Sequence, residues 1–101
     1  MDIKKYNLKR SKLFRTDLKN TLKYIADDLQ NPIVSENMLN LVEKRIKKMS
    51  QNPLIYPKYK SKKYTYYKVQ VKNYTILYVV QKNTIILSRF FYSRRNFEKL
   101  L

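Results

Sequence analysis

The sequence of 101 residues contains no cysteine, no histidine and no glycine. Without cysteine the chain cannot form a disulfide, a thiol nucleophile or a thiolate metal site. The lack of histidine removes the commonest general base and the commonest metal ligand. Without glycine there is no glycine-rich phosphate loop, and tight turns must use Asn, Ser, Pro or Lys. We therefore expect neither a metal ion nor a cofactor.

Long apolar stretches are missing as well. No run approaches the roughly 18 residues of a membrane span, and the N-terminus lacks the apolar core of a signal peptide. These patterns predict a soluble, cytoplasmic protein with no membrane role. The length suits one domain over residues 1–101, and 44% apolar residues provide the material for its core.

Acidic side chains are scarce, at seven against 23 lysines and arginines, which gives a net charge of +16. Residues 1–52 carry a net +6, whereas residues 53–101 carry a net +10 and contain one acidic side chain, Glu98. Such a field favours DNA, RNA, an acidic protein partner or an anionic membrane surface. Compositional drift is the alternative interpretation, since Lys, Asn, Tyr and Ile are all abundant together.

The first half of the chain predicts a strand and two helices. Residues 4–10 alternate in polarity, which is typical of a short, half-buried strand. Ser11 stands at an N-cap position, Asn31 stands at another, and Pro32 suits the first residue of the second helix. The short link between the helices predicts an antiparallel hairpin whose apolar stripes a flat surface must cover. The stripes are Phe14, Leu18, Leu22, Ile25 and Leu29, then Val34, Met38, Leu41, Val42, Ile46 and Met49.

The second half predicts strands. Residues 58–63 have the composition of a basic connector, and from Tyr64 onward the apolar residues recur with a period of two. Residues 74–80 and 84–92 are apolar on both faces, which is typical of buried strands. The pairs at 72–73 and 82–83 are Lys-Asn, and asparagine tolerates the positive φ of a tight turn. The expected fold is α+β: a strand, a helix hairpin, a three-stranded antiparallel meander packed on it, and a short tail.

Three arginines near the end of the chain are candidate binding residues. Arg94 and Arg95 follow the last strand, and forked guanidinium groups suit phosphate or carboxylate. Alternatively they are a solvated pair that covers the end of the sheet. Arg89 lies within an apolar strand, so it either pairs with a carboxylate or opens onto a groove. Glu98 is a candidate partner for Arg94 or Arg95, or forms only a weak surface pair.

Other side chains allow two interpretations each. Lys68 and Lys72 either contact phosphate or belong to an exposed strand face. Tyr66 and Tyr92 either stack on bases or pack against the sheet. The tail carries Phe97, Leu100 and Leu101, which we expect to bind back to the body of the protein in the free state.

Three segments resemble the RelE/ParE superfamily of bacterial toxins from type II toxin–antitoxin modules. TLKYIADDLQNP (21–32) is similar to the helix end and turn of the ParE branch. YKVQVKNYTILYVV (67–80) is similar to the strand pair of the superfamily. FFYSRRNFEKLL (90–101) resembles its closing strand and tail. The resemblance covers nearly the whole chain, and the three segments occur in the right order and at the right spacing.

The resemblance implies a small basic toxin that stops growth unless an acidic antitoxin wraps it. ParE-like members bind and poison DNA gyrase without being enzymes, and RelE-like members cut mRNA on the ribosome. Thr75 stands where ribonuclease members commonly carry arginine, and Tyr92 stands where some carry histidine. These departures and the long hairpin favour gyrase poisoning, with Arg89, Arg94 and Arg95 as target-binding residues.

Two alternatives remain, so whether the chain is an enzyme stays open. A ribonuclease acting on ribosome-bound mRNA would use Tyr92, Arg94, Lys68 and Lys72 as its candidate catalytic group. Tyrosine or lysine as the base needs a strongly lowered pKa, which a highly positive field can supply. A non-toxic basic nucleic-acid-binding protein would instead show binding that weakens steeply with salt.

Overall fold

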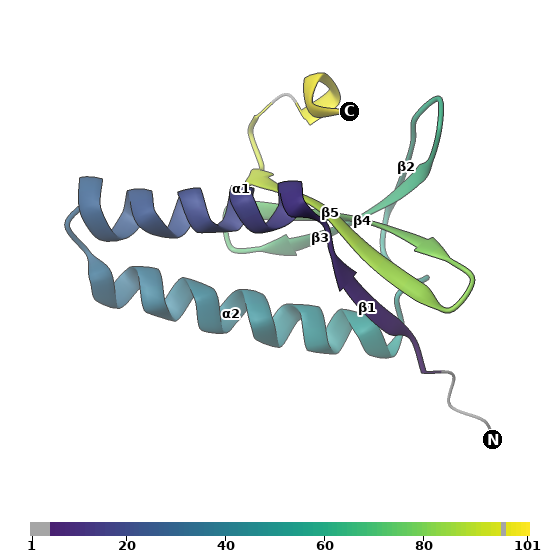
Figure 1. Ribbon diagram of the computed structural model, residues 1–101, viewed down its shortest axis with the longest axis horizontal. Coiled ribbons are helices and arrows are strands. Elements are labelled where there is room, and N and C mark those ends of the chain that lie inside the picture. The colour runs from purple at the N-terminus through teal and green to yellow at the C-terminus, as the bar shows by residue number, and fades with distance from the viewer. Residues whose placement is uncertain (1–4, 96) are drawn as a thin grey trace.

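A helix hairpin covers one face of a five-stranded mixed sheet in the computed structural model, which describes residues 5–95 and 97–101 (Figure 1). The predicted α+β class and the order of its elements are confirmed. The elements in chain order are β1 (Asn7–Arg10), α1 (Lys12–Lys23), the π-helical turn η1 (Tyr24–Asp28), α2 (Pro32–Gln51), β2 (Lys58–Lys60), β3 (Thr65–Val71), β4 (Tyr74–Gln81), β5 (Thr84–Tyr92) and the 3₁₀ turn η2 (Phe97–Leu100).

Both helix starts are capped as the sequence predicts. The Ser11 hydroxyl accepts a hydrogen bond from the Phe14 N–H at 3.0 Å. The Asn31 side chain accepts one from the Val34 N–H at 3.3 Å, and Pro32 begins α2. Each cap satisfies a backbone donor that the first turn of a helix leaves unpaired.

The apolar stripes are buried along part of the hairpin, as far as Ile25 in η1. Leu29, Val34 and Leu41 are exposed, so their assignment to the core was wrong. For Leu29 and Val34 the cause is twofold: the wider π-helical turn η1 changes the helical phase after Lys23, and the hairpin projects past the sheet (Figure 1). Leu41 lies over the covered part of α2, where its neighbour Val42 is the buried residue.

The core lies between the hairpin and the inner face of the sheet. Tyr78 at its centre is fully buried, and its ring stacks on Tyr67 with centroids 5.3 Å apart. The Tyr78 hydroxyl donates a 2.6 Å hydrogen bond to the Pro53 carbonyl oxygen, which satisfies it inside the core. Burial, followed by the neighbouring Tyr56 and Tyr67, raises the pKa of Tyr78 well above the ordinary tyrosine value.

The sheet has the strand order β1-β5-β4-β3-β2, with β1 parallel to β5 and the other pairs antiparallel. The predicted meander β3-β4-β5 and its two tight turns are confirmed. The positive φ of each turn falls on the lysine, at 53° for Lys72 and 57° for Lys82. The expectation that the following asparagine would supply it was therefore wrong. A positive φ at the first of the two central residues alone is the pattern of a type II′ hairpin turn, whose twist matches that of the strands.

The basic segment 58–63 is more than a connector, which corrects the sequence interpretation. Lys58–Lys60 forms the edge strand β2, in register with Tyr67, Tyr66 and Thr65 of β3. The Lys68 N–H extends the pairing with a 2.9 Å hydrogen bond to the Pro57 carbonyl oxygen. Lysines suit such an edge because their charges discourage pairing with another chain.

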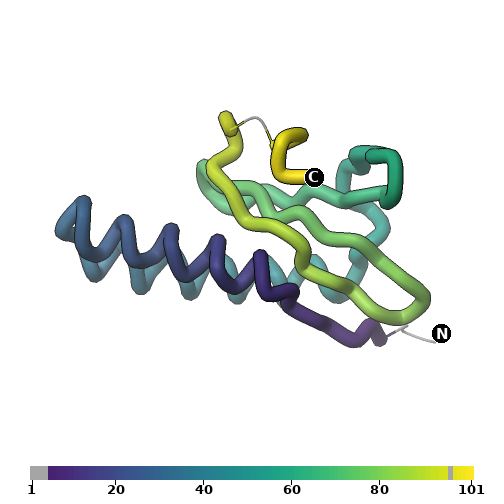
Figure 2. Tube along the Cα trace, turned by 45° about the horizontal axis from the view of Figure 1, so that its top comes forward, coloured from purple at the N-terminus to yellow at the C-terminus, as the bar shows by residue number. Residues whose placement is uncertain are grey.

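The tail folds back over the outer face of the sheet, on the side away from the hairpin (Figure 2). Phe97 stacks on Phe91 of β5 with centroids 5.4 Å apart and meets the edge of Tyr59 at 4.9 Å. Beneath the tail, Thr75, Leu77 and Val79 of β4 are buried. The expectation that the tail binds back to the body is confirmed for Phe97, whereas Leu101 stays exposed.

Candidate binding site at the end of the sheet

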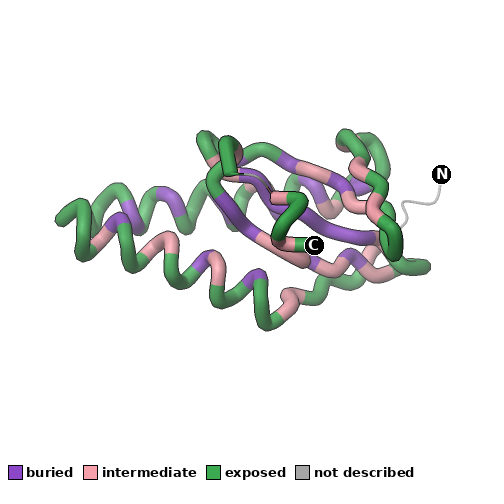
Figure 3. Tube along the Cα trace, turned by 90° about the horizontal axis from the view of Figure 1, so that it is seen from above, coloured by how far each residue is buried: buried purple, intermediate pink, exposed green. Residues whose placement is uncertain are grey.

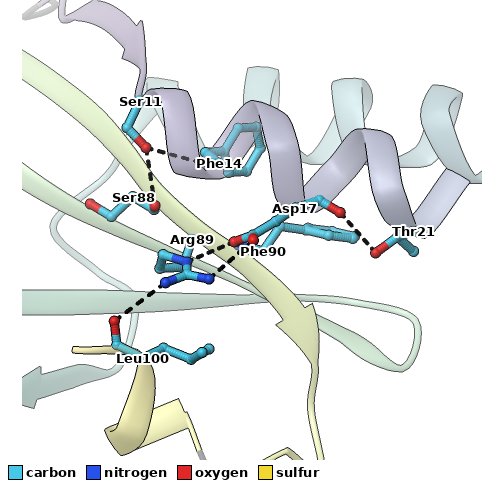
Figure 4. Close-up of polar contacts among 8 residues, drawn as sticks. All are labelled: Ser11, Phe14, Asp17, Thr21, Ser88, Arg89, Phe90 and Leu100. Atoms are coloured by element: carbon cyan, nitrogen blue, oxygen red, sulfur yellow. Dashed lines mark hydrogen bonds and ion pairs between the residues drawn. The ribbon is translucent and has the colours of Figure 1, made fainter.

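Arg89 forms an internal ion pair with Asp17 of α1 (Figure 4). Its Nε donates to Asp17 Oδ2 at 2.7 Å, and its Nη2 donates to Oδ1 at 3.1 Å. Its Nη1 donates to the Leu100 carbonyl oxygen at 3.3 Å. Of the two sequence interpretations, pairing with a carboxylate is confirmed. A role for Arg89 in target binding stays a prediction, because most of its fork is already occupied.

The strand pairing explains why the ion pair lies there. β1 ends at Arg10, which pairs with Leu87, so the edge of β5 has no partner strand beyond that point. Asp17 Oδ2 fills this place by accepting the Phe90 N–H at 3.0 Å. A register shift between β4 and β5 at Leu77/Tyr78 lies beside Arg89, and such irregularities redirect side chains.

Hydrogen bonds join the β3–β4 turn to the end of β5. The Ser93 N–H donates to the Asn73 carbonyl oxygen at 2.8 Å. Gln70 Nε2 donates to Ser93 Oγ at 2.7 Å and to the Lys72 carbonyl oxygen at 2.8 Å. Buried Thr75 lies 2.9 Å from Ser93 through their hydroxyls, so it is a structural member of this network.

This network positions Tyr92 and Arg94 together. Both line a small cavity of about 200 Å³ with Gln70, Asn73 and Ser93. Arg95 lines a different cavity of about 310 Å³, which Asp17, Tyr24 and Tyr74 also border. Tyr92 lies between the two and meets the Tyr74 ring at 5.7 Å. The adjacent arginines are exposed and border separate cavities.

Lys68 and Lys72 form a second group. Lys68 Nζ lies 5.3 Å from the centroid of the Phe97 ring, an attractive cation–π distance that ties the tail to β3. Both lysines line a cavity of about 390 Å³ together with Arg45 and Tyr56. The four candidate catalytic residues are therefore divided between two cavities, with Tyr92 and Arg94 in one and the lysines in the other.

Two nearby tyrosines, neither of them a candidate catalytic residue, have raised pKa values. Burial raises the pKa of Tyr74, and the neighbouring Tyr24 and Tyr92 add to the effect. Burial likewise raises the pKa of Tyr66, helped by Tyr64. Both groups are kept in the neutral phenol form, which is the wrong form for a general base.

Sequence reasoning missed a cavity of about 780 Å³ between the β2–β3 hairpin and the tail. Glu98 hydrogen-bonds Tyr59 at its edge, and burial together with this carboxylate raises the pKa of Tyr59. The predicted pairing of Glu98 with Arg94 or Arg95 stays a prediction. Lysines interleaved with tyrosines were the signal in the sequence. The lining residues are Tyr59, Lys60, Ser61, Lys62, Lys63, Tyr64, Tyr66, Glu98 and Leu101.

Two solved structures of toxin–antitoxin systems contain chains with a similar fold. The chain is similar to a chain of the chromosomal ParDE toxin–antitoxin system from P. aeruginosa, with a TM-score of 0.73, 13% identity, and coverage of 86% of this chain and 95% of that one. It is also similar to a chain of the RelB–RelE antitoxin–toxin complex from Methanococcus jannaschii, with a TM-score of 0.51, 26% identity, and coverage of 92% and 99%. No curated protein matches the chain in sequence.

A helix hairpin on one face of a mixed sheet is the architecture of the RelE/ParE superfamily of toxins. Within that superfamily, the chain belongs to the family of ParE toxins of the type II toxin–antitoxin system parDE, whose family model matches residues 8–97. The sequence resemblance is thereby confirmed. Among the described helices, none is both long and apolar enough to cross a membrane.

Proposed function

We propose that this toxin arrests growth in the cytoplasm by binding and poisoning DNA gyrase, without acting as an enzyme. Membership of the ParE toxin family supports this target. The observation that accompanies it is that Tyr92 and Arg94 border one cavity while Lys68 and Lys72 border an adjoining one that shares Gln70, so no single cavity is lined by all four candidate catalytic residues. Cleavage by the 2′-oxygen needs a base, a charge-stabilising group and an acid around one phosphate.

The exposed arginines are the target-binding residues of this proposal. Arg94 and Arg95 leave the sheet at a turn in which the Arg95 N–H donates to the Tyr92 carbonyl oxygen at 2.9 Å. The hydrogen-bonded network of Gln70, Thr75 and Ser93 holds the start of this turn in place. A fixed backbone reduces the ordering cost when two long side chains bind a carboxylate or phosphate.

An acidic antitoxin is the second partner. The similar ParDE and RelB–RelE structures are both toxin–antitoxin assemblies, which supports an antitoxin for this chain. We place its acidic segment in the lysine- and tyrosine-lined cavity beside the tail, because carboxylates match Lys60, Lys62 and Lys63 there. Glu98 already hydrogen-bonds Tyr59 at the same place, so a carboxylate of the antitoxin could replace that of Glu98 in this hydrogen bond.

Inducible expression in a bacterium that carries a reporter plasmid tests the target. We expect loss of negative supercoiling, or gyrase-dependent DNA breaks, while transcripts stay intact. The charge-reversed variant Arg94→Glu/Arg95→Glu should relieve growth arrest and restore supercoiling at equal expression. Transcripts cut within codons at unchanged plasmid topology would refute gyrase poisoning and establish the ribonuclease. Unimpaired growth with the unaltered chain would refute both activities.

A further inference from the structure

The tip of the helix hairpin differs in charge from the rest of the molecule. Residues 24–42 contain no lysine or arginine and three acidic side chains, Asp27, Asp28 and Glu36. The remaining 82 residues carry all 23 basic side chains and four acidic ones, of which Glu43 is paired with Arg10. A strongly basic protein therefore carries one acidic projection, and the gyrase and antitoxin contacts proposed for its basic residues do not account for it.

The tip also exposes large apolar side chains. η1 and the start of α2 project beyond the sheet (Figure 1), and Figure 3 shows this end of the hairpin as largely exposed. Ile33 is 71% exposed, Leu29 56% and Val34 44%. We call these three residues the tip patch. Single exposed apolar residues are ordinary, but three within six residues at one projecting end are typical of an interaction surface.

Local contacts fix the shape of the tip. The Leu29 N–H donates to the Tyr24 carbonyl oxygen and the Asn31 N–H to that of Ile25, both at 3.1 Å. Between them Gln30 has a φ of 51°, an uncommon conformation for a residue with a Cβ. π-helical turns such as η1 occur frequently at functional sites. A surface formed in advance loses less conformational entropy on binding.

We propose that the tip patch docks into an apolar groove rimmed by lysine and arginine on the DNA-facing surface of gyrase. This inference rests on the proposed function and adds a second contact to it. Asp27 and Asp28 form an acidic rim next to the tip patch. This rim repels nucleic acid and an acidic antitoxin, so the occupant is a basic protein surface. Enzymes that hold DNA carry such surfaces where the phosphates lie. A second copy of this chain also presents a basic surface, and sedimentation tests for it.

Binding of purified gyrase to the immobilised chain tests the proposal. Leu29→Ser/Ile33→Ser removes apolar area at constant charge and should weaken binding at least tenfold. Asp27→Lys/Asp28→Lys reverses the rim and should weaken binding most at low salt. The matched control is Leu54→Ser/Ile55→Ser, which removes two similarly exposed apolar side chains outside the tip and should bind like the unaltered chain. Circular dichroism melts check that every variant is folded.

The outcomes separate this inference from the proposed function. If the unaltered chain binds gyrase and both tip variants bind equally well, the tip patch is not the docking surface, although the target stands. If the unaltered chain does not bind gyrase, both the proposed target and the docking of the tip patch on it are refuted. If sedimentation shows a dimer that the tip variants abolish, a second copy is the occupant and the proposal is overturned.

Discussion

Replacing Asp17 with alanine should destabilise the toxin more than replacing any exposed charged residue. The Asp17 carboxylate accepts three hydrogen bonds, two from Arg89 and one from the Phe90 N–H. Both side chains of the pair are only 16% exposed. Removing one partner of a buried ion pair costs about 3–5 kcal/mol, because the other charge stays buried without compensation.

The remaining exposure and the Leu100 carbonyl oxygen lower that cost for Arg89. We therefore expect Asp17→Ala to reduce the free energy of unfolding by about 2–4 kcal/mol. For a domain of this size, such a loss lowers the melting temperature by about 10 °C or more. Urea unfolding followed by circular dichroism measures the change directly.

A double-mutant cycle with Arg89→Met assigns the loss to the pair. The double variant should be more stable than the sum of the single changes predicts, by about 1–3 kcal/mol. The more exposed Arg10–Glu43 pair is a matched control, since it is also an arginine–carboxylate pair with two hydrogen bonds, at 2.7 and 2.8 Å. Glu43→Ala should cost less than about 1 kcal/mol. Additive effects at Asp17 and Arg89, or equal costs at Asp17 and Glu43, would refute the reasoning.

Three further predictions follow from the core, the tail and the lysine cavity. Because the pKa of Tyr78 is raised on folding, the unfolded chain releases this proton first, near the ordinary tyrosine value of about 10. Its contribution to stability is therefore complete below that pH and declines above it, and unfolding titrations should show a shallower alkaline decline for Tyr78→Phe. Phe97→Ala should free the tail from Phe91 and Tyr59, which faster amide exchange at Leu100 would report; unchanged exchange would contradict the packing. Lys60→Ser/Lys62→Ser/Lys63→Ser should weaken the binding of polyglutamate and reduce its salt dependence, and equal salt dependence would remove the antitoxin from this cavity.

The features of the fold that sequence reasoning anticipated are those with local causes. Ser11 and Asn31 cap helices through bonds to residues three positions away, so the chain itself shows them. The meander follows from a period of two with a Lys-Asn pair between the strands. The short strand β2 was missed because three residues are too few to show a period of two; only its pairing with β3 makes it a strand.

The candidate site depended more on distant contacts. The sequence indicated that Arg89 needs a carboxylate, but nothing local identifies Asp17, which lies 72 positions away. The exposure of Leu29 follows from a π-helical turn that a regular helical period does not show. Tyr92 and Arg94 border a different cavity from Lys68 and Lys72. This division depends on how the β3–β4 turn lies against the turn after β5, which only the assembled sheet defines.

The most direct test of the gyrase target uses purified components. The chain is added to purified gyrase, relaxed plasmid and ATP, and supercoiling and covalent enzyme–DNA breaks are measured on the same gel. Gyrase poisoning predicts less supercoiling and more breaks in proportion to the chain, with Arg94→Glu/Arg95→Glu inactive. Normal supercoiling at a large excess of the folded chain, without breaks, would contradict it.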